Sequence, residues 1–216
     1  MIVGALSSNS RHTDVETFLD ALASADPTPG GGAGAALALA MGAALVEMTA
    51  RLSTGRRRFR AIEPDMQRVI GRCEAVRVEA LELIDADAQA YERVMAAYGL
   101  ARGTEHEREH RDTELSRASH QASLVPLRVA ASAAEVVDLA LETEEKGNQN
   151  VTSDAGGGAA LARAAIRISE MNVQTNLTSI IDPEVRGELT DALNKAVAVL
   201  DSADAVVESV LARDVS

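Results

Sequence analysis

Apolar residues recur at helical spacing along most of the chain, and no segment alternates with the two-residue period of a β-strand. The pattern is clearest after Pro64, where it is carried by Met66, Val69, Ile70, Cys73, Val76, Leu81 and Ile84. Since a helix tolerates proline in its first turn, and Gly99 and Gly103 follow, we predict one long helix from Pro64 to Tyr98. The fold class expected from this periodicity is an all-α antiparallel bundle of about six helices, several of them long.

Capping residues and breakers place the other elements. Residues 1–11 are expected to form a flexible arm, and Thr13 or Asp14 can cap a short helix that ends near Ser24. A proline inside a helix removes one backbone donor, so Pro126 predicts a kink or a break in the fourth helix. The other expected helices run from the glycines after Pro29 to about Leu52, from Thr104 to Gly147, from an Asp154 cap to Ile180, and from an Asp182 cap to about Arg213.

The segment from Pro27 to Met48 reads PTPGGGAGAALALAMGAALVEM and is the most apolar part of the chain. It has no charge between Gly30 and Val46, and its many Ala and Gly residues allow other helices to approach closely. A membrane span needs about 20 strongly apolar residues, which is more than this run supplies. We therefore expect a buried core helix and no membrane partner.

Composition narrows the class of protein. A chain of 216 residues can bury one sizeable core, and we expect a single domain over residues 1–216. The net charge of -12 argues against nucleic acid as a partner, because phosphate binding requires a clustered basic surface. The only cysteine, Cys73, excludes an internal disulfide and provides no zinc-binding set, and the N-terminal residues lack the pattern of a secretion signal, so a cytoplasmic location is expected.

Three stretches carry candidate chemistry, and the first is the triple glycine Gly30, Gly31 and Gly32. Glycines can adopt backbone angles that other residues avoid, and the exposed amides of the helix behind them can bind an anion or a developing negative charge. A tight turn between helices is the equally simple interpretation.

The second stretch is LIDADAQAY, residues 83–91. On a helix, Asp87 and Tyr91 lie one turn apart on one face, while Asp85 points elsewhere. Partial burial among Leu83 and Ile84 raises the pKa of a carboxylate, so that it can act as an acid or base near neutral pH. The alternative is a solvated helix face with a structural tyrosine.

The third stretch is GNQNVTSDAGGG, with short polar side chains at Asn148, Asn150, Ser153 and Asp154 before a glycine-rich helix start. These residues are typical of a helix cap, and a cap beside a cleft can also bind a ligand. Further along the chain, Asn172 lies one turn before Asn176, an amide pair that burial would force into a hydrogen bond between helices.

These motifs together resemble the cyclodeaminase domain of formiminotransferase-cyclodeaminase and the bacterial methenyltetrahydrofolate cyclohydrolases. The resemblance rests on PTPGGG followed by an Ala/Gly/Leu helix ending in LVEM, on LIDADAQAY, on KGNQNVTSDAG and on NVQTNL, in this order over nearly the whole chain. Relatives commonly have NVRINL in the last motif, where this chain has Gln174 and Thr175.

The resemblance implies a one-carbon tetrahydrofolate enzyme. It would hydrolyse 5,10-methenyltetrahydrofolate to 10-formyltetrahydrofolate, or cyclise 5-formiminotetrahydrofolate with release of ammonia. The substrate is a folate-like small molecule, and no metal or cofactor is implied; the four histidines, His12, His106, His110 and His120, lack a carboxylate framework for a metal. By this resemblance Asp87 is the catalytic residue, and the substrate-binding residues are Pro29, Gly30, Gly31, Gly32, Tyr91, Asn148, Asn150, Ser153, Asp154 and Asn172.

Two other interpretations stay open on the sequence. The same scaffold can act on a different small amidine, imine or cyclic compound, which the departures at Gln174 and Thr175 favour. A non-catalytic helical binding protein is the second, because few aromatic residues are present to stack on a pterin. In each case long helices with Ala-rich faces favour a homodimer.

Overall fold

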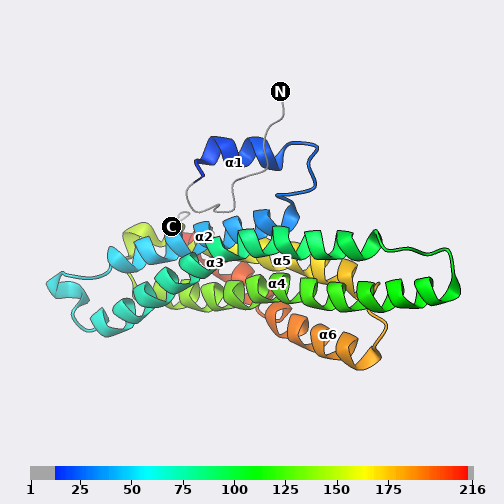
Figure 1. Ribbon diagram of the computed structural model, residues 1–216. Helices are drawn as coiled ribbons and strands as arrows, with labels where there is room; N and C mark the ends of the chain where they lie inside the picture. The colour runs from blue at the N-terminus through cyan, green and yellow to red at the C-terminus, as the bar shows by residue number, and fades with distance from the viewer. Residues whose placement is uncertain (1–12, 214–216) are drawn as a thin grey trace.

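The computed structural model describes residues 13–213, which form a bundle of α-helices (Figure 1). Its elements are α1 (Val15–Leu22), α2 (Gly31–Arg51), η2 (Arg57–Phe59), α3 (Glu63–Tyr98), α4 (Glu105–Lys146), η3 (Gln149–Val151), α5 (Thr152–Leu177), α6 (Pro183–Val197) and α7 (Leu200–Arg213). Over this range there is no β-strand, so the all-α prediction is confirmed. The arm predicted for residues 1–11 lies outside the described residues.

Helix α2 is the centre of the bundle and packs against α3, α4 and α5. It is the one helix between residues 13 and 213 that is long and apolar enough to cross a membrane, but 67% of that segment is buried inside the protein. The absence of bulky side chains allows close contact with α5, because a Cβ atom added to Gly158 would lie 2.9 Å from the carbonyl oxygen of Gly42 and 2.6 Å from Cγ2 of Val46. The expected core helix is therefore present, with its backbone almost touching that of α5.

The long helices α3 and α4 run antiparallel and extend beyond the N-terminal end of α2 (Figure 1). As predicted, α3 begins with Pro64 in its first turn. A capping box begins α4: the Thr104 hydroxyl accepts a hydrogen bond from the amide of Glu107, whose carboxylate accepts one from the amide of Thr104. Helix α4 continues through Pro126, so of the two predicted outcomes, a kink or a break, the break does not occur.

Other helix ends differ from the predictions. Helix α5 begins at Thr152, directly after the 3-10 turn η3, so Asp154 lies within its first turn and is not its cap. Asp182 does cap α6, where its carboxylate accepts a hydrogen bond at 2.9 Å from the Glu184 amide. The single helix predicted from there to Arg213 is wrong, since the structure divides it into α6 and α7 although no proline or glycine marks the division.

Helices α1 and α5 both end earlier than predicted. Asp14 caps α1 by accepting a hydrogen bond from the Thr17 amide at 2.9 Å, as predicted, but α1 ends at Leu22. Helix α5 ends at Leu177 and not at Ile180.

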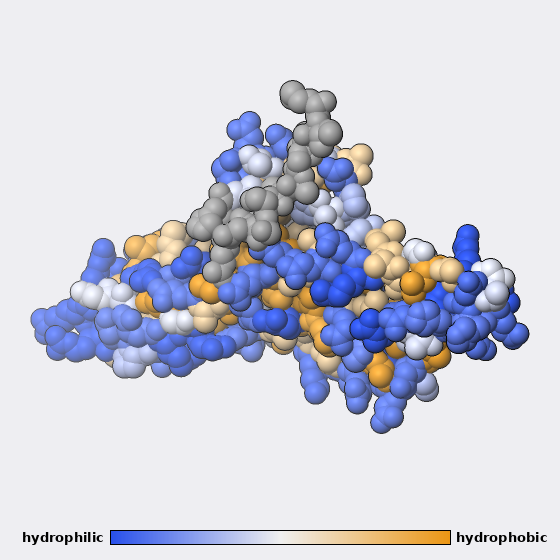
Figure 2. All heavy atoms as spheres, in the orientation of Figure 1, coloured by the Kyte–Doolittle hydropathy of each residue, from blue (hydrophilic) through white to orange (hydrophobic). Residues whose placement is uncertain are grey.

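Hydrophilic side chains cover much of the face shown in Figure 2, with apolar patches between them.

Candidate active site

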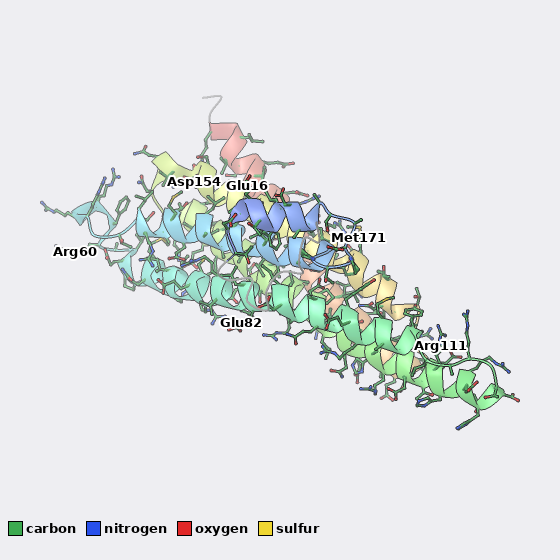
Figure 3. The ribbon with its side chains drawn as sticks, turned by 45° about the horizontal axis from the view of Figure 1, so that its top comes forward. Glu16, Arg60, Glu82, Arg111, Asp154 and Met171 are labelled. Atoms are coloured by element: carbon green, nitrogen blue, oxygen red, sulfur yellow. The ribbon has the colours of Figure 1, made fainter. Side chains whose placement is uncertain are left out.

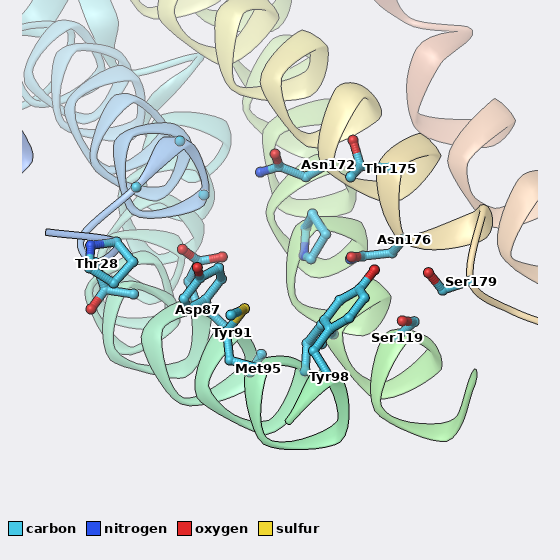
Figure 4. Close-up of a pocket in the computed structure, with 18 of the residues that line it drawn as sticks. Thr28, Asp87, Tyr91, Met95, Tyr98, Ser119, Asn172, Thr175, Asn176 and Ser179 are labelled. Atoms are coloured by element: carbon cyan, nitrogen blue, oxygen red, sulfur yellow. The ribbon is translucent and has the colours of Figure 1, made fainter. Parts of the chain in front are cut away.

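A cavity of about 390 Å³ opens where the N-terminus of α2 meets α3, α4 and the C-terminal part of α5 (Figure 4). This volume is within the range of small-molecule sites. The cavity is lined by Pro27, Thr28, Gly30, Gly31, Gly32, Asp87, Ala90, Tyr91, Val94, Met95, Tyr98, Ser119, Ala122, Pro126, Asn172, Thr175, Asn176, Thr178 and Ser179.

Asp87 lies directly against the first turn of α2. A Cβ atom built on Gly32 would lie 2.0 Å from Oδ1 of Asp87, so no other residue fits at position 32 without moving this carboxylate. The backbone amide of Ala33 interacts with the Asp87 carboxylate and lowers its pKa. At least this amide at the start of α2 therefore faces the protein's own carboxylate.

This close approach explains Gly32 of the triple glycine, and none of the three glycines has a positive φ. Gly30, the N-cap of α2, has an extended conformation with φ of -124°. Among the described residues only Gly55 has a positive φ. Gly31 has ordinary space, since an added Cβ would lie 3.8 Å from the nearest side-chain atom, on Ile168.

The environment of Asp87 raises the pKa of its carboxyl group. Burial against α2 is the largest cause, because it disfavours the charged form, and the hydrogen bond from the Ala33 amide opposes it in part. Asp87 is still partly open to the cavity, so it can exchange a proton with a ligand. Asp85 does not line the cavity, in agreement with the prediction that only one of the two faces inwards.

One face of α3 continues the site beyond Asp87. Tyr91, Met95 and Tyr98 line the cavity, with exposed fractions of 39%, 46% and 46%. The guanidinium of Arg111 lies 5.3 Å from the ring centre of Tyr98 and donates a hydrogen bond to its backbone carbonyl. These large, half-exposed side chains provide a surface for a flat ring.

The opposite wall comes from the end of α5, with Asn172, Thr175 and Asn176, and from the turn that follows it, with Ser179; in Figure 4 the Asn176 side chain points into the space between α5 and α3. No hydrogen bond within the described residues uses the side-chain amide of Asn172 or of Asn176. The hydrogen bond between helices that their burial would have required is therefore not formed, and both amides can bind a ligand.

Sequence reasoning missed several of these residues. Tyr98 extends the helical face of Asp87 and Tyr91, and Ser179 extends that of Asn172, so helical spacing was the available signal. For Ser119, Ala122 and Pro126 on α4 the sequence held no such signal, because nothing in it places that face opposite Asp87.

A model of the formiminotransferase-cyclodeaminase family matches residues 14–195 of the chain. This chain belongs to that family. A methenyltetrahydrofolate cyclohydrolase from Methylorubrum extorquens is 39% identical over 168 residues, which cover 78% of this chain and 81% of that protein. A formimidoyltransferase-cyclodeaminase from Sus scrofa is 30% identical over 202 residues, which cover 90% of this chain but 37% of that protein.

The fold agrees with the same family. The crystal structure of a formiminotetrahydrofolate cyclodeaminase from Thermotoga maritima superposes with a TM-score of 0.86 and 29% sequence identity. The superposition covers 95% of this chain and 99% of that one.

Some residues singled out in the family motifs lie away from the cavity. Asn148 and Asn150 belong to the connection between α4 and α5, and Ser153 and Asp154 to the first turn of α5; Figure 3 shows Asp154 near the end of the bundle that carries Arg60. Along α5, Asp154 and Asn172 are about 27 Å apart at 1.5 Å per residue. Pro29 is buried and does not line the cavity. A substrate role for these five residues stays a prediction.

The connection itself is held by hydrogen bonds within the chain. The Asn148 amide donates to Oγ of Ser53 at 2.7 Å, and its side chain donates to the carbonyl of Leu52 at 3.3 Å and accepts from the Asn150 amide at 3.3 Å. These contacts join the end of α2 to the start of α5.

The two departures from the usual family motif differ in position. Gln174 is exposed and outside the cavity, whereas Thr175 is part of its wall. The Thr175 hydroxyl donates to the carbonyl of Met171 at 2.9 Å. Among residues 13–213 there is no group of three or more His, Cys, Asp or Glu side chains that could hold a metal ion.

Proposed function

We propose that this member of the formiminotransferase-cyclodeaminase family hydrolyses 5,10-methenyltetrahydrofolate to 10-formyltetrahydrofolate in the cavity between α2, α3, α4 and α5. The observation that carries the proposal is Asp87, a partly buried carboxylate with a raised pKa at the wall of a ligand-sized cavity. The 39% identity to a cyclohydrolase, over most of both chains, supports this reaction.

The substrate is a cation whose positive charge is shared by N5, the methenyl carbon and N10. Asp87 in its charged form stabilises this cation and removes a proton from the water that attacks the methenyl carbon. The C–O bond forms while the carbon becomes tetrahedral. Asp87 then gives the proton to N5 as the bond between N5 and the carbon breaks, and the hydroxyl proton leaves to solvent as the formyl group forms on N10.

The other side chains bind and orient the substrate. Tyr91 and Tyr98 provide a surface for the pterin or aminobenzoyl ring, and the free amides of Asn172 and Asn176 are donors and acceptors for its polar atoms. Because the substrate itself carries the electrophilic carbon, we propose that no cofactor or metal takes part.

Cyclisation of 5-formiminotetrahydrofolate is the second candidate, and the similarity to a cyclodeaminase structure favours it. In that reaction N10 attacks the formimino carbon, and the resulting amino group leaves as ammonia. Asp87 would then act as the acid that protonates the leaving nitrogen, a role which a raised pKa also suits.

The test is turnover of both substrates by the purified protein, followed by the methenyl absorbance, which disappears on hydrolysis and appears on cyclisation. Thermal melting with and without each folate measures binding separately from chemistry. Melting that rises without turnover would support the binding-protein alternative. If neither binding nor turnover of any folate is found, a different amidine or imine substrate is indicated, and Thr175 in the cavity wall is then the first position to examine.

We also propose that the protein is a homodimer. Helix α2 and its C-cap Leu52 carry exposed apolar side chains, with Met41, Met48 and Leu52 exposed by 46%, 40% and 44%. A second copy would cover these side chains. Light scattering at micromolar concentration measures the mass, and a monomer there contradicts this part of the proposal.

A further inference from the structure

Pro126 lies at a position where α4 lacks one of its hydrogen bonds. In an α-helix each backbone N–H donates to the carbonyl four residues earlier, and proline has no N–H. Because α4 is continuous from Glu105 to Lys146, the carbonyl of Ala122 is the one that lacks its donor, four residues before Pro126. Within the described residues, no turn, cap or side-chain hydrogen bond ends on this oxygen either.

The residue that carries this carbonyl lines the cavity. Ser119, Ala122 and Pro126 all line the cavity and lie at positions i, i+3 and i+7, which form one face of α4. A helical carbonyl points along the axis towards residue i+4, so the oxygen of Ala122 lies between two residues that face the cavity. The ring of an interior proline also pushes this carbonyl away from the axis.

A backbone carbonyl accepts hydrogen bonds and cannot donate them. The hydroxyls and carboxamides elsewhere in the cavity, such as those of Ser119, Asn172 and Asn176, can do both and adapt to either kind of ligand atom. A carbonyl without its regular helical donor therefore discriminates between ligands, because a ligand that lacks a donor at this point cannot replace the missing hydrogen bond.

We infer that the carbonyl of Ala122, left free by Pro126, accepts a hydrogen bond from a ring N–H of the substrate, which makes Pro126 a residue that determines specificity. This inference rests on the proposed function, since a tetrahydropterin ring has such donors at N3, at N8 and on its 2-amino group. Pro126 affects binding of the pterin ring, whereas Asp87 acts on the reacting carbon.

Two substitutions restore the missing N–H. Pro126→Val keeps a side chain of similar volume, and Pro126→Ala leaves a smaller one, so a shared effect comes from the N–H and not from the lost ring. Both variants should melt no lower than the wild type, because each regains a helical hydrogen bond. Both should raise KM and Kd for methenyltetrahydrofolate about tenfold, while kcat changes little.

The control is Pro64→Ala, since Pro64 in the first turn of α3 interrupts no helical hydrogen bond and lies outside the cavity. It should leave KM unchanged. If the two Pro126 variants bind and turn over the substrate with the wild-type KM, or if only Pro126→Ala is affected, the inference is overturned while the proposed function stands. If the wild type itself binds no tetrahydrofolate, the proposed function and the inference both fail.

The ligand provides an independent check. Tetrahydropterin analogues that replace the 2-amino group by methyl, methylate N3 or replace N8 by carbon each remove one donor. One of them should bind the wild type about tenfold more weakly than the parent compound but bind Pro126→Val as well as the parent does. Equal losses in both proteins for every analogue would contradict the assigned hydrogen bond.

Discussion

Gly32→Ala is the sharpest test of how the site is built. The new Cβ atom would lie 2.0 Å from Oδ1 of Asp87, whereas ordinary contact begins at 3.4 Å, so the carboxylate must retreat by about 1.4 Å (3.4 minus 2.0). A misplacement of about 1 Å can reduce a catalysed rate by about 100-fold, which corresponds to ~2.7 kcal/mol at 25 °C. We therefore expect kcat for hydrolysis to fall by about 100-fold or more.

The neighbouring glycines are matched controls. At Gly31 the new Cβ would be no closer than 3.8 Å to any other group, and at Gly34 it would meet nothing within 4 Å. Alanine stabilises a helix interior by up to ~1 kcal/mol relative to glycine, or about 2–4 °C in melting temperature for a domain of this size. Gly31→Ala and Gly34→Ala should thus keep most of the activity and melt no lower.

The assay is steady-state hydrolysis of methenyltetrahydrofolate for the three variants, beside their melting curves. A folded Gly32→Ala protein with a wild-type rate would refute the idea that contact with α2 positions Asp87. Equal losses in all three variants would show instead that the loop, and not this one contact, controls the rate.

Further predictions concern Asp87 and the distant connection. Asp87→Asn should reduce turnover by about 100-fold and also raise Kd for the cationic substrate, because the charge that offsets the cation is lost, while Asp85→Asn should do much less, as measured by steady-state kinetics and melting with ligand. Burial raises the pKa of Asp87 in the folded state. Its contribution to stability is therefore greatest below the ordinary carboxyl pKa of about 4 and is lost as pH rises through the raised value. Asp87→Asn should thus melt higher than the wild type at pH 7, with a smaller difference at low pH. Hydrolysis should increase with pH through the same raised pKa, since the base must be charged, whereas a rate that falls with pH would indicate the acid role of the cyclisation. Asn148→Ala should lower the melting temperature through its lost hydrogen bonds and leave KM unchanged; a raised KM with normal melting would support the substrate role predicted from its motif.

The sequence predicted most of the fold because its signals are local. Pro64, Asp14 and Asp182 act on the helices that they begin, and their effects can be read from neighbouring residues. The division between α6 and α7 at Ala198 and Val199 has no such local signal, because no proline or glycine lies there.

The candidate site was predicted in part for the same reason. Asp87, Tyr91 and Asn172 were found through motifs, and they do line one cavity. The purpose of Gly32 could not be predicted, because its contact with Asp87 joins residues 55 positions apart (87 minus 32). The position of Pro126 in the cavity wall could not be predicted either, since only the folded bundle places α4 opposite these residues.

The contact between Asp87 and the start of α2 also sets the electrical polarity of the cavity. A helix N-terminus carries a partial positive charge, and an open one would repel the methenyl cation. Asp87 occupies the amide of Ala33 and so screens this charge with its own. Removing the carboxylate would do more than remove a base: it would uncover a positive helix end in the cavity and turn a site suited to cations into one suited to small anions.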